Sequence, residues 1–215
     1  ADALCVPYIK NGSMVCAFGE KEDPAVQELY DRGIANQIPG LEILSGEEAR
    51  AIEPNLSTAI TSVLHVTNAG IICPYDLTIA SVGNAMDNGV ELKTYFEVTD
   101  IKAVADGFEI FSGDEKITAN HIINAAGVFA DKIAKMAGDT TFDVHPRRGE
   151  YVLLDKESGS HIKHTIFVTP SKMGKGILVS PTVAITLLAL YFLDVAGKVL
   201  PTDFPYVNPA PKQRH

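Results

Sequence analysis

Apolar residues in the first third of the chain fall into short runs and helical stripes. The run Met14–Phe18 is apolar throughout and follows an Asn-Gly turn, which is typical of a buried strand. Asp23 and Pro24 then have the side chains that favour the N-cap and the first turn of a helix. The predicted helix has its apolar stripe at Val26, Leu29, Tyr30 and Ile34.

Capping and turn residues mark the next elements. Ser45 and Glu48 have the spacing of a capping box, which predicts a short helix that stops before Pro54. Residues 62–66 are a strand candidate, and a helix is predicted over 74–88, where an Asn-Gly pair would end it. Helices placed between strands in this way indicate mixed α and β structure.

The middle of the chain predicts an antiparallel meander and a buried strand. Apolar residues over 90–101 predict the first strand, and turns at 106–107 and 112–114 separate the next two. Residues 121–127 read as an apolar strand that ends in small residues, and a helix over 129–136 follows it. We expect a meander inserted in a parallel α/β sheet, and an α+β fold class.

Composition and charge are those of an ordinary soluble domain. Of the 215 residues, 46% are hydrophobic and 21% are charged, and 18 basic against 27 acidic side chains give a net charge of −9. This composition excludes a disordered, collagen-like or coiled-coil chain. An acidic chain also lacks the basic face that nucleic acid or an anionic membrane requires, whereas a small anionic substrate needs only a local arginine.

Cysteine usage and one uncharged stretch bear on location. The three cysteines form no CxxC pair, which favours a reducing cytoplasm over a disulfide framework. No basic and apolar leader opens the chain, so we expect no secretory signal. Residues 176–193 are uncharged over 18 positions, the minimum for a spanning helix, but they include Pro181. We therefore expect strand and loop there, and no transmembrane segment.

Two segments have side chains suited to a ligand. Ile123–Gly127 ends in three residues no larger than alanine, so the backbone can approach a ligand and the next helix start can face a phosphate. Tight packing of helix on sheet explains the same residues. Arg147–Tyr151 has two arginines, a glycine, a carboxylate and an aromatic, which suit a bound phosphate or carboxylate. A solvated basic loop is the alternative there.

Other candidates carry less weight. Cys73 is better explained as a small buried side chain than as a nucleophile, because no histidine is fixed beside it in sequence. His161 and His164 are three residues apart but lack a second pair of ligands, so no metal site is predicted. His145 is a candidate for proton transfer, although a single histidine is more often structural. The chain has no GxSxG, Walker, HExxH or GxGxxG motif.

Taken in order, the motifs resemble one family over about residues 3–183. They are NGSMVCAF, PGLEILSGEEARAIEPNL, NAGIICPYDLTIA, NGVELKTYFEVTDI, HIINAAGVFADKIAKMAG, PRRGEYVLLDK and SKMGKGILVSPTV. This order resembles the FAD-dependent oxidoreductases of the D-amino-acid oxidase superfamily. It is most similar to the branch that contains glycerol-3-phosphate dehydrogenase and L-2-hydroxyglutarate dehydrogenase.

The resemblance implies a cofactor and the residues that contact it. FAD is the expected cofactor, and the protein mainly positions it and tunes its surroundings. Val98 matches the position whose backbone meets the adenine. The strand end that passes beside the dinucleotide matches Asn124, Ala125, Ala126 and Gly127.

The resemblance also implies the substrate side. Arg148, Glu150 and Tyr151 match the strand that lies over the flavin ring, and they are the candidate catalytic residues. We expect Arg148 to bind the substrate anion, since its guanidinium suits phosphate or carboxylate, and the other two to shape the pocket. The implied reaction is oxidation of glycerol 3-phosphate by hydride transfer to flavin, and L-2-hydroxyglutarate is the alternative substrate.

The sequence departs from the family pattern at both ends. The Gly-rich turn that receives the pyrophosphate and the last FAD segment of the family are missing, so we expect an internal fragment that does not retain FAD by itself. We assign residues 1–73 and 139–183 to a substrate-binding domain and 74–138 to a partial FAD-binding domain. Residues 184–215 lose the pattern and are expected to be a frameshifted tail. A non-catalytic family member and an unrelated α+β binding module remain alternatives.

Overall fold

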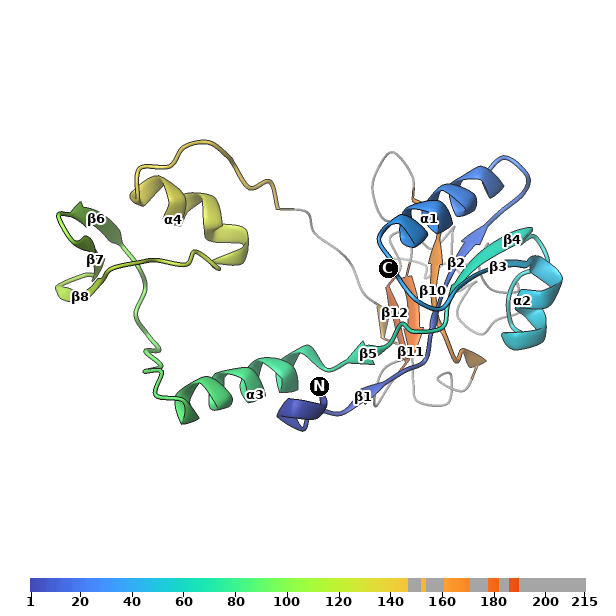
Figure 1. Ribbon diagram of the computed structural model, residues 1–215, viewed down its shortest axis with the longest axis horizontal. Coiled ribbons are helices and arrows are strands. Elements are labelled where there is room, and N and C mark those ends of the chain that lie inside the picture. The colour runs from blue at the N-terminus through green and yellow to red at the C-terminus, as the bar shows by residue number, and fades with distance from the viewer. Residues whose placement is uncertain (147–151, 154–160, 171–177, 182–185, 190–215) are drawn as a thin grey trace, which may run out of the picture. The chain divides into compact units, whose positions relative to one another are not determined.

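The computed structural model describes residues 1–146, 152–153, 161–170, 178–181 and 186–189. The chain divides into two compact units, which are described separately (Figure 1). The first comprises Ala1–Asn84 with Gly149–His215, and the second comprises Ala85–Arg148. Which unit binds substrate and which binds cofactor stays a prediction.

The first unit is built on one mixed sheet of strand order β3-β4-β2-β10-β11-β12-β9. Neighbouring strands are antiparallel except β2 and β10, which are parallel and pair Ser13 with Thr165. The predicted strands at 14–18 and 62–66 are confirmed within this sheet. The strands are β2 Ser13–Ala17, β3 Leu41–Ser45, β4 Ser62–Val66, β9 Val152–Leu153, β10 Thr165–Val168, β11 Leu178–Pro181 and β12 Thr186–Ala189.

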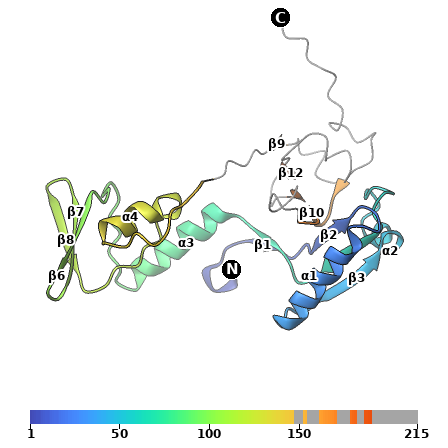
Figure 2. The ribbon, with the colours of Figure 1, turned by 90° about the horizontal axis from the view of Figure 1, so that it is seen from above.

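Alternate residues of β2 enter two hydrophobic clusters. Ala17 packs with Val26 of α1 (Asp23–Ala35), whereas Cys16 packs with Ala49 of α2 (Gly46–Ile52). Because successive strand side chains point to opposite faces, the two helices cover opposite faces of the sheet. Figure 2 shows α1 lying beside β2 and β3.

The predicted start of α2 is confirmed, whereas the predicted N-cap of α1 was wrong by one residue. The capping box of α2 is confirmed, because Ser45 accepts the Glu48 N–H and the Glu48 carboxylate accepts the Ser45 N–H. The N-cap of α1 is Glu22, so the assignment to Asp23 was wrong by one residue. Asp23 Oδ1 instead accepts hydroxyl hydrogen bonds from Thr61 at 2.7 Å and from the next serine at 2.6 Å, and such distant partners leave no local signal.

A two-stranded ribbon and a helix lie outside the seven-stranded sheet. The ribbon pairs β1 (Tyr8–Ile9) with β5 (Ile71–Ile72). The predicted helix is confirmed as α3 (Pro74–Asp87), and Gly89 follows it at φ +87°. None of the α3 residues is buried within the described structure. A short 3-10 helix, η1, spans Asp2–Leu4 at the start of the chain.

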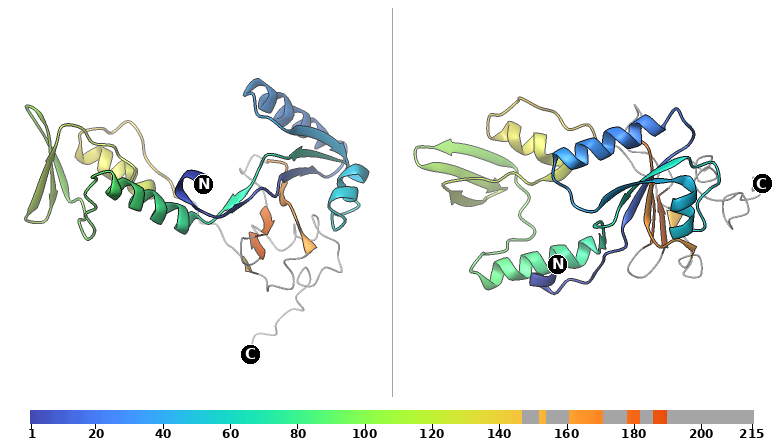
Figure 3. Two further views of the ribbon diagram at one scale, coloured as in Figure 1. Left: turned by 60° about the horizontal axis from the view of Figure 1, so that its bottom comes forward. Right: turned by 45° about the vertical axis from the view of Figure 1, so that its right-hand side comes forward.

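The second unit has the predicted meander of three antiparallel strands. These are β6 (Asp100–Val104), β7 (Gly107–Ser112) and β8 (Glu115–Ala119). The 3-10 helix η2 (Gly127–Phe129) then leads into α4 (Ala130–Met136), which contacts β6. Figure 3 shows these elements from two further sides. The small core of this unit consists of Ile101, Ile110 and Ala134.

Two strand predictions in this unit were wrong. Residues 90–99 have no strand before β6 begins at Asp100. Residues 121–126 also form no strand, and the side chain of Ile123 is 93% exposed. An apolar run becomes a buried strand only when neighbouring strands supply hydrogen bonds, and no described strand of this chain flanks residues 121–126.

The uncharged run at 176–193 includes strands β11 and β12, as expected for strand and loop. Within the described ranges, no helix has the length and apolar character needed to cross a membrane.

Candidate functional site

The predicted contact residues fall into a described and an undescribed group. Val98 and the segment from Asn124 to Gly127 belong to the second unit and are described. Arg148, Glu150 and Tyr151 lie outside the described residues, so their roles stay predictions.

The Asn124 side chain holds the turn that leads into α4. Its Nδ2 donates to the carbonyl oxygen of Ala130 at 2.8 Å, and its Oδ1 accepts from the N–H of Ala126 at 3.3 Å. Gly127 has φ +57°, a conformation that glycine adopts without steric cost. A Cβ at Gly127 would meet no atom within 4 Å, so the turn needs glycine for its backbone conformation and has open space beside it.

The backbone of this turn is accessible to a ligand. The side chains of Ala125 and Ala126 end at a methyl group, and Gly127 has none. No described hydrogen bond uses the N–H of Gly127 or Val128. Free N–H groups beside small side chains fit the phosphate or ribose oxygens of a dinucleotide. The residues present therefore fit one edge of an FAD site.

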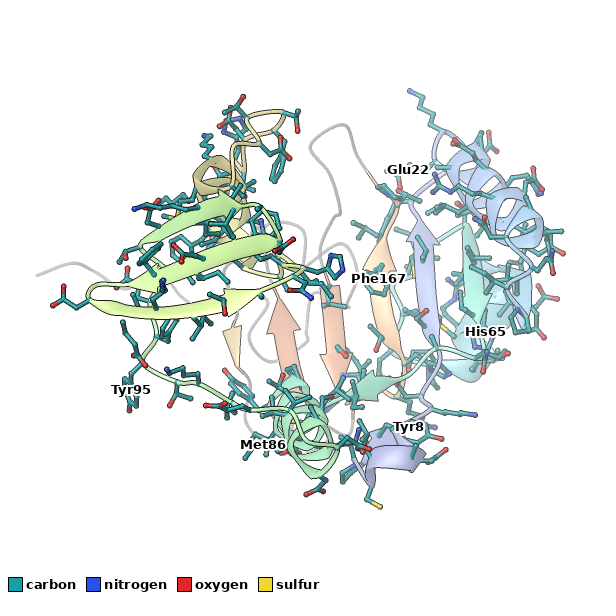
Figure 4. The ribbon with its side chains drawn as sticks, turned by 60° about the vertical axis from the view of Figure 1, so that its left-hand side comes forward. Tyr8, Glu22, His65, Met86, Tyr95 and Phe167 are labelled. Carbon is teal, nitrogen blue, oxygen red and sulfur yellow. The ribbon has the colours of Figure 1, made fainter. Side chains whose placement is uncertain are left out.

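Val98 lies two residues before β6 in a similarly open position. The N–H of its neighbour Thr99 donates to the carbonyl of Phe111 at 2.8 Å, and the Thr99 hydroxyl donates to the same oxygen. These bonds fix the chain on β7, whereas no described hydrogen bond uses the backbone of Val98 itself. Its N–H and C=O are thus available to a base edge. Tyr95, three residues earlier, projects into solvent with φ +57° (Figure 4).

A groove runs between the meander and α4 within the second unit. It is mostly apolar, and Asn124 and Asp139 are its polar members. Two hydrogen bonds from Thr141, from its hydroxyl and its N–H, hold the pKa of Asp139 below its usual range. The apolar lining consists of Ile101, Phe108, Ile122, Ala130, Ile133, Ala134, Ala137 and Phe142.

A buried polar network in the first unit was not predicted from the sequence. Glu53 is 1% exposed, and its Oε2 accepts the N–H of Lys163 at 2.8 Å and the N–H of His164 at 3.1 Å. His164 Nδ1 lies 3.0 Å from the same oxygen, and its ring meets that of His65 edge-on at 5.5 Å. Figure 4 shows His65 on β4. The carboxylate joins the end of α2 to the start of β10 over 110 residues of sequence, which no local pattern reveals.

The cysteine thiols of the chain differ in burial. Burial raises the pKa of the Cys16 thiol to about 12, which keeps it protonated. Cys73 is half-buried and, like the other cysteines, is not in a disulfide. No described group of three or more His, Cys, Asp or Glu residues is arranged to hold a metal ion.

Comparison with known proteins relates the chain to flavoproteins. The family model described as "FAD dependent oxidoreductase" matches residues 1–205. Glycerol 3-phosphate dehydrogenase of Caloramator mitchellensis is 41% identical over 191 residues, which are 87% of this chain and 40% of that protein. Human mitochondrial L-2-hydroxyglutarate dehydrogenase is 25% identical over 178 residues, which are 77% of this chain and 38% of that protein.

A solved structure agrees with these sequence matches. It is the dithionite-reduced L-alpha-glycerophosphate oxidase of Mycoplasma pneumoniae with FAD bound, at a TM-score of 0.78 and 32% identity. The match covers 86% of this chain and 50% of that one. The chain therefore spans about half or less of the length of the relatives it matches.

Proposed function

The chain belongs to the family of FAD-dependent oxidoreductases, and on this premise we propose that the whole protein oxidises glycerol 3-phosphate by hydride transfer to flavin. The observation that carries the proposal is the 41% identity to glycerol 3-phosphate dehydrogenase, against 25% to L-2-hydroxyglutarate dehydrogenase. Family membership removes the unrelated binding module from the alternatives.

The cofactor side of the proposal involves the second unit. Bound FAD would accept the hydride from the carbinol carbon of the substrate. The dinucleotide would lie against Ala125, Ala126 and Gly127 of the turn that Asn124 holds, where no large side chain obstructs it. The free backbone of Val98 would hydrogen-bond the adenine edge. The pyrophosphate turn of the family has no counterpart in these 215 residues, so we propose that this chain alone does not retain FAD.

The substrate side involves Arg148, whose planar fork of N–H donors suits a phosphate. Glu150 and Tyr151 would shape the pocket around the carbinol. Substituting Arg148→Ala removes charge-assisted hydrogen bonds worth about 1.5–3 kcal/mol and should raise KM for glycerol 3-phosphate roughly 10- to 100-fold. The neighbouring Arg147→Ala is the matched control and should leave KM within about threefold.

Substrate-dependent bleaching of the flavin absorption tests the proposal. The protein in the length of its relatives, loaded with FAD, is mixed without oxygen with glycerol 3-phosphate, L-2-hydroxyglutarate or glycerol. We expect bleaching by glycerol 3-phosphate alone. Bleaching by L-2-hydroxyglutarate would assign the second candidate, and bleaching by neither would indicate a non-catalytic family member.

The location proposed is the cytoplasm, either free or peripheral to the membrane. It rests on three cysteines that are all free, as suits a reducing compartment. Fractionation of cells that express the native gene would test it.

A further inference from the structure

Strand β3 is one edge of the seven-stranded sheet in the first unit (Figure 1). It pairs with β4 without a bulge, from Leu41 opposite Val66 to Ser45 opposite Ser62, and no described strand lies on its other side. The strand contains no lysine, arginine or proline. Natural edge strands commonly use such residues or a bulge to prevent pairing with a further strand. Within the described structure, the edge of β3 therefore lacks these barriers.

Two hydrogen bonds at the ends of β3 determine which of its backbone groups face β4. The N–H of Thr67 donates to the carbonyl of Gly40 at 2.9 Å, and the N–H of Gly46 donates to the carbonyl of Thr61 at 2.9 Å. Bonded and non-bonded residue pairs alternate along an antiparallel ladder. Counting inward from either end, the even-numbered residues of β3 bond to β4. The odd-numbered residues direct their N–H and C=O away from β4.

The outward backbone groups of β3 belong to Leu41, Ile43 and Ser45. The N–H of Ser45 is used in the capping box of α2, where the Glu48 carboxylate accepts it. Among the described residues, no hydrogen bond uses the outward N–H or C=O of Leu41 or Ile43. These two residues thus offer two donors and two acceptors along a strand edge, which is the arrangement that an added strand requires.

The side chains at this edge differ between the two faces of the sheet. Leu41 packs in the cluster beside α1, and Ile43, on the same face, is 39% exposed. Glu42 points to the opposite face, and its side chain is 55% exposed. The first turn of α2, which follows the strand directly, adds the exposed Glu47 and Glu48. The edge is therefore apolar on the α1 face and has acidic side chains elsewhere.

We propose that the edge of β3 binds an extended segment of a partner protein as an additional strand, and that this segment has a basic residue between two apolar ones. Its main chain bonds to Leu41 and Ile43, and its apolar side chains cover Ile43 on the α1 face. Its basic side chain lies opposite Glu42 on the other face. Main-chain hydrogen bonds supply affinity in this mode of binding, and alternate side chains supply specificity. The proposal goes beyond the oxidation reaction and does not depend on it.

Amide hydrogen exchange, followed by nuclear magnetic resonance on the 215-residue chain, tests strand addition. The peptide Thr-Val-Lys-Val-Thr has the proposed pattern, and its control has N-methyl groups on both valines, which remove the N–H donors. In excess, the first peptide should slow exchange at the Leu41 and Ile43 amides by roughly tenfold or more, whereas the control should not. The amides of Glu42 and Leu44, which bond to β4, should exchange slowly with or without peptide.

Three results would overturn the proposal. The first is exchange at Leu41 and Ile43 that the peptide does not slow, or that both peptides slow equally. The second is slow exchange at these amides without peptide in the protein in the length of its relatives, because its own chain would then cover the edge. The third is protection that rises with chain concentration in the absence of peptide, which would assign the edge to a second copy.

A charge exchange tests the proposed partner chemistry. Glu42→Lys should weaken binding of Thr-Val-Lys-Val-Thr and strengthen binding of Thr-Val-Glu-Val-Thr, each by roughly three- to tenfold, because charges directly opposite each other interact across a strand pair. Glu91→Lys is the matched control, since it changes the net charge equally at an exposed residue of the second unit. It should bind both peptides as the unchanged chain does. With both variants folded by circular dichroism, equal peptide preference of the two would overturn the proposal.

Discussion

Replacing the buried carboxylate Glu53 should destabilise the first unit more than any surface change on the same helix. In Glu53→Ala, two peptide N–H groups and the imidazole of His164 lose their common acceptor. Breaking a buried charged network by removing one partner costs about 3–5 kcal/mol. Glu53→Gln retains an acceptor without the charge, so its cost should be about 1–2 kcal/mol.

Urea unfolding of the chain, followed by far-ultraviolet circular dichroism, measures these free energies. The control is Glu47→Ala, because Glu47 is exposed on the same helix and should change stability by no more than about 0.5 kcal/mol. Amide exchange at Lys163 and His164 reports the same loss locally. A Glu53→Ala chain within about 1 kcal/mol of the parent, with these two amides still protected, would refute the reasoning.

Four further predictions follow from the surroundings of individual residues. Hydrogen bonds from the Ser45 N–H and hydroxyl lower the pKa of Glu48, so this contribution to stability is present above pH 4.5 and is lost as the pH falls through the folded value. Ser45→Ala should move the pKa of Glu48 back toward 4.5, as nuclear magnetic resonance titration would show. Iodoacetamide at about pH 8 should alkylate the exposed Cys5 and leave Cys16 unmodified until the chain unfolds, as mass spectrometry of the peptides would show, because burial raises the pKa of Cys16 to about 12. Gly46→Ala should cost about 3 kcal/mol in urea unfolding, since its Cβ would overlap the backbone carbonyl oxygen of Ile60. The same change at Gly83, which has open space in α3, should stabilise the chain by about 0.5–1 kcal/mol.

Elements with a complete local signal were predicted from the sequence. The capping box of α2, the Asn-Gly end of α3 and the turns of the meander depend on residues a few positions apart. Strand β3 was missed, because its five residues lie at the edge of the sheet with a mostly exposed pattern. The parallel pairing of β2 with β10 joins segments about 150 residues apart, and short-range periodicity carries no information on it.

The candidate site was predictable only in its local part. The Ala-Ala-Gly turn has the conformation that its residues favour, with Asn124 as the side chain that holds it. The strand expected before it did not form, since its partners are absent from the described chain. No local sequence pattern predicted the buried role of Glu53, because its hydrogen bonds reach residues 110 and 111 positions away.

The central claim is that this sequence belongs to an enzyme that oxidises glycerol 3-phosphate. The most direct measurement is the anaerobic absorption spectrum of the FAD-loaded protein, in the length of its relatives, before and after one equivalent of glycerol 3-phosphate. We expect full loss of the oxidised flavin spectrum and formation of one equivalent of dihydroxyacetone phosphate. An unchanged spectrum with glycerol 3-phosphate, from a protein whose flavin dithionite still reduces, would contradict the claim.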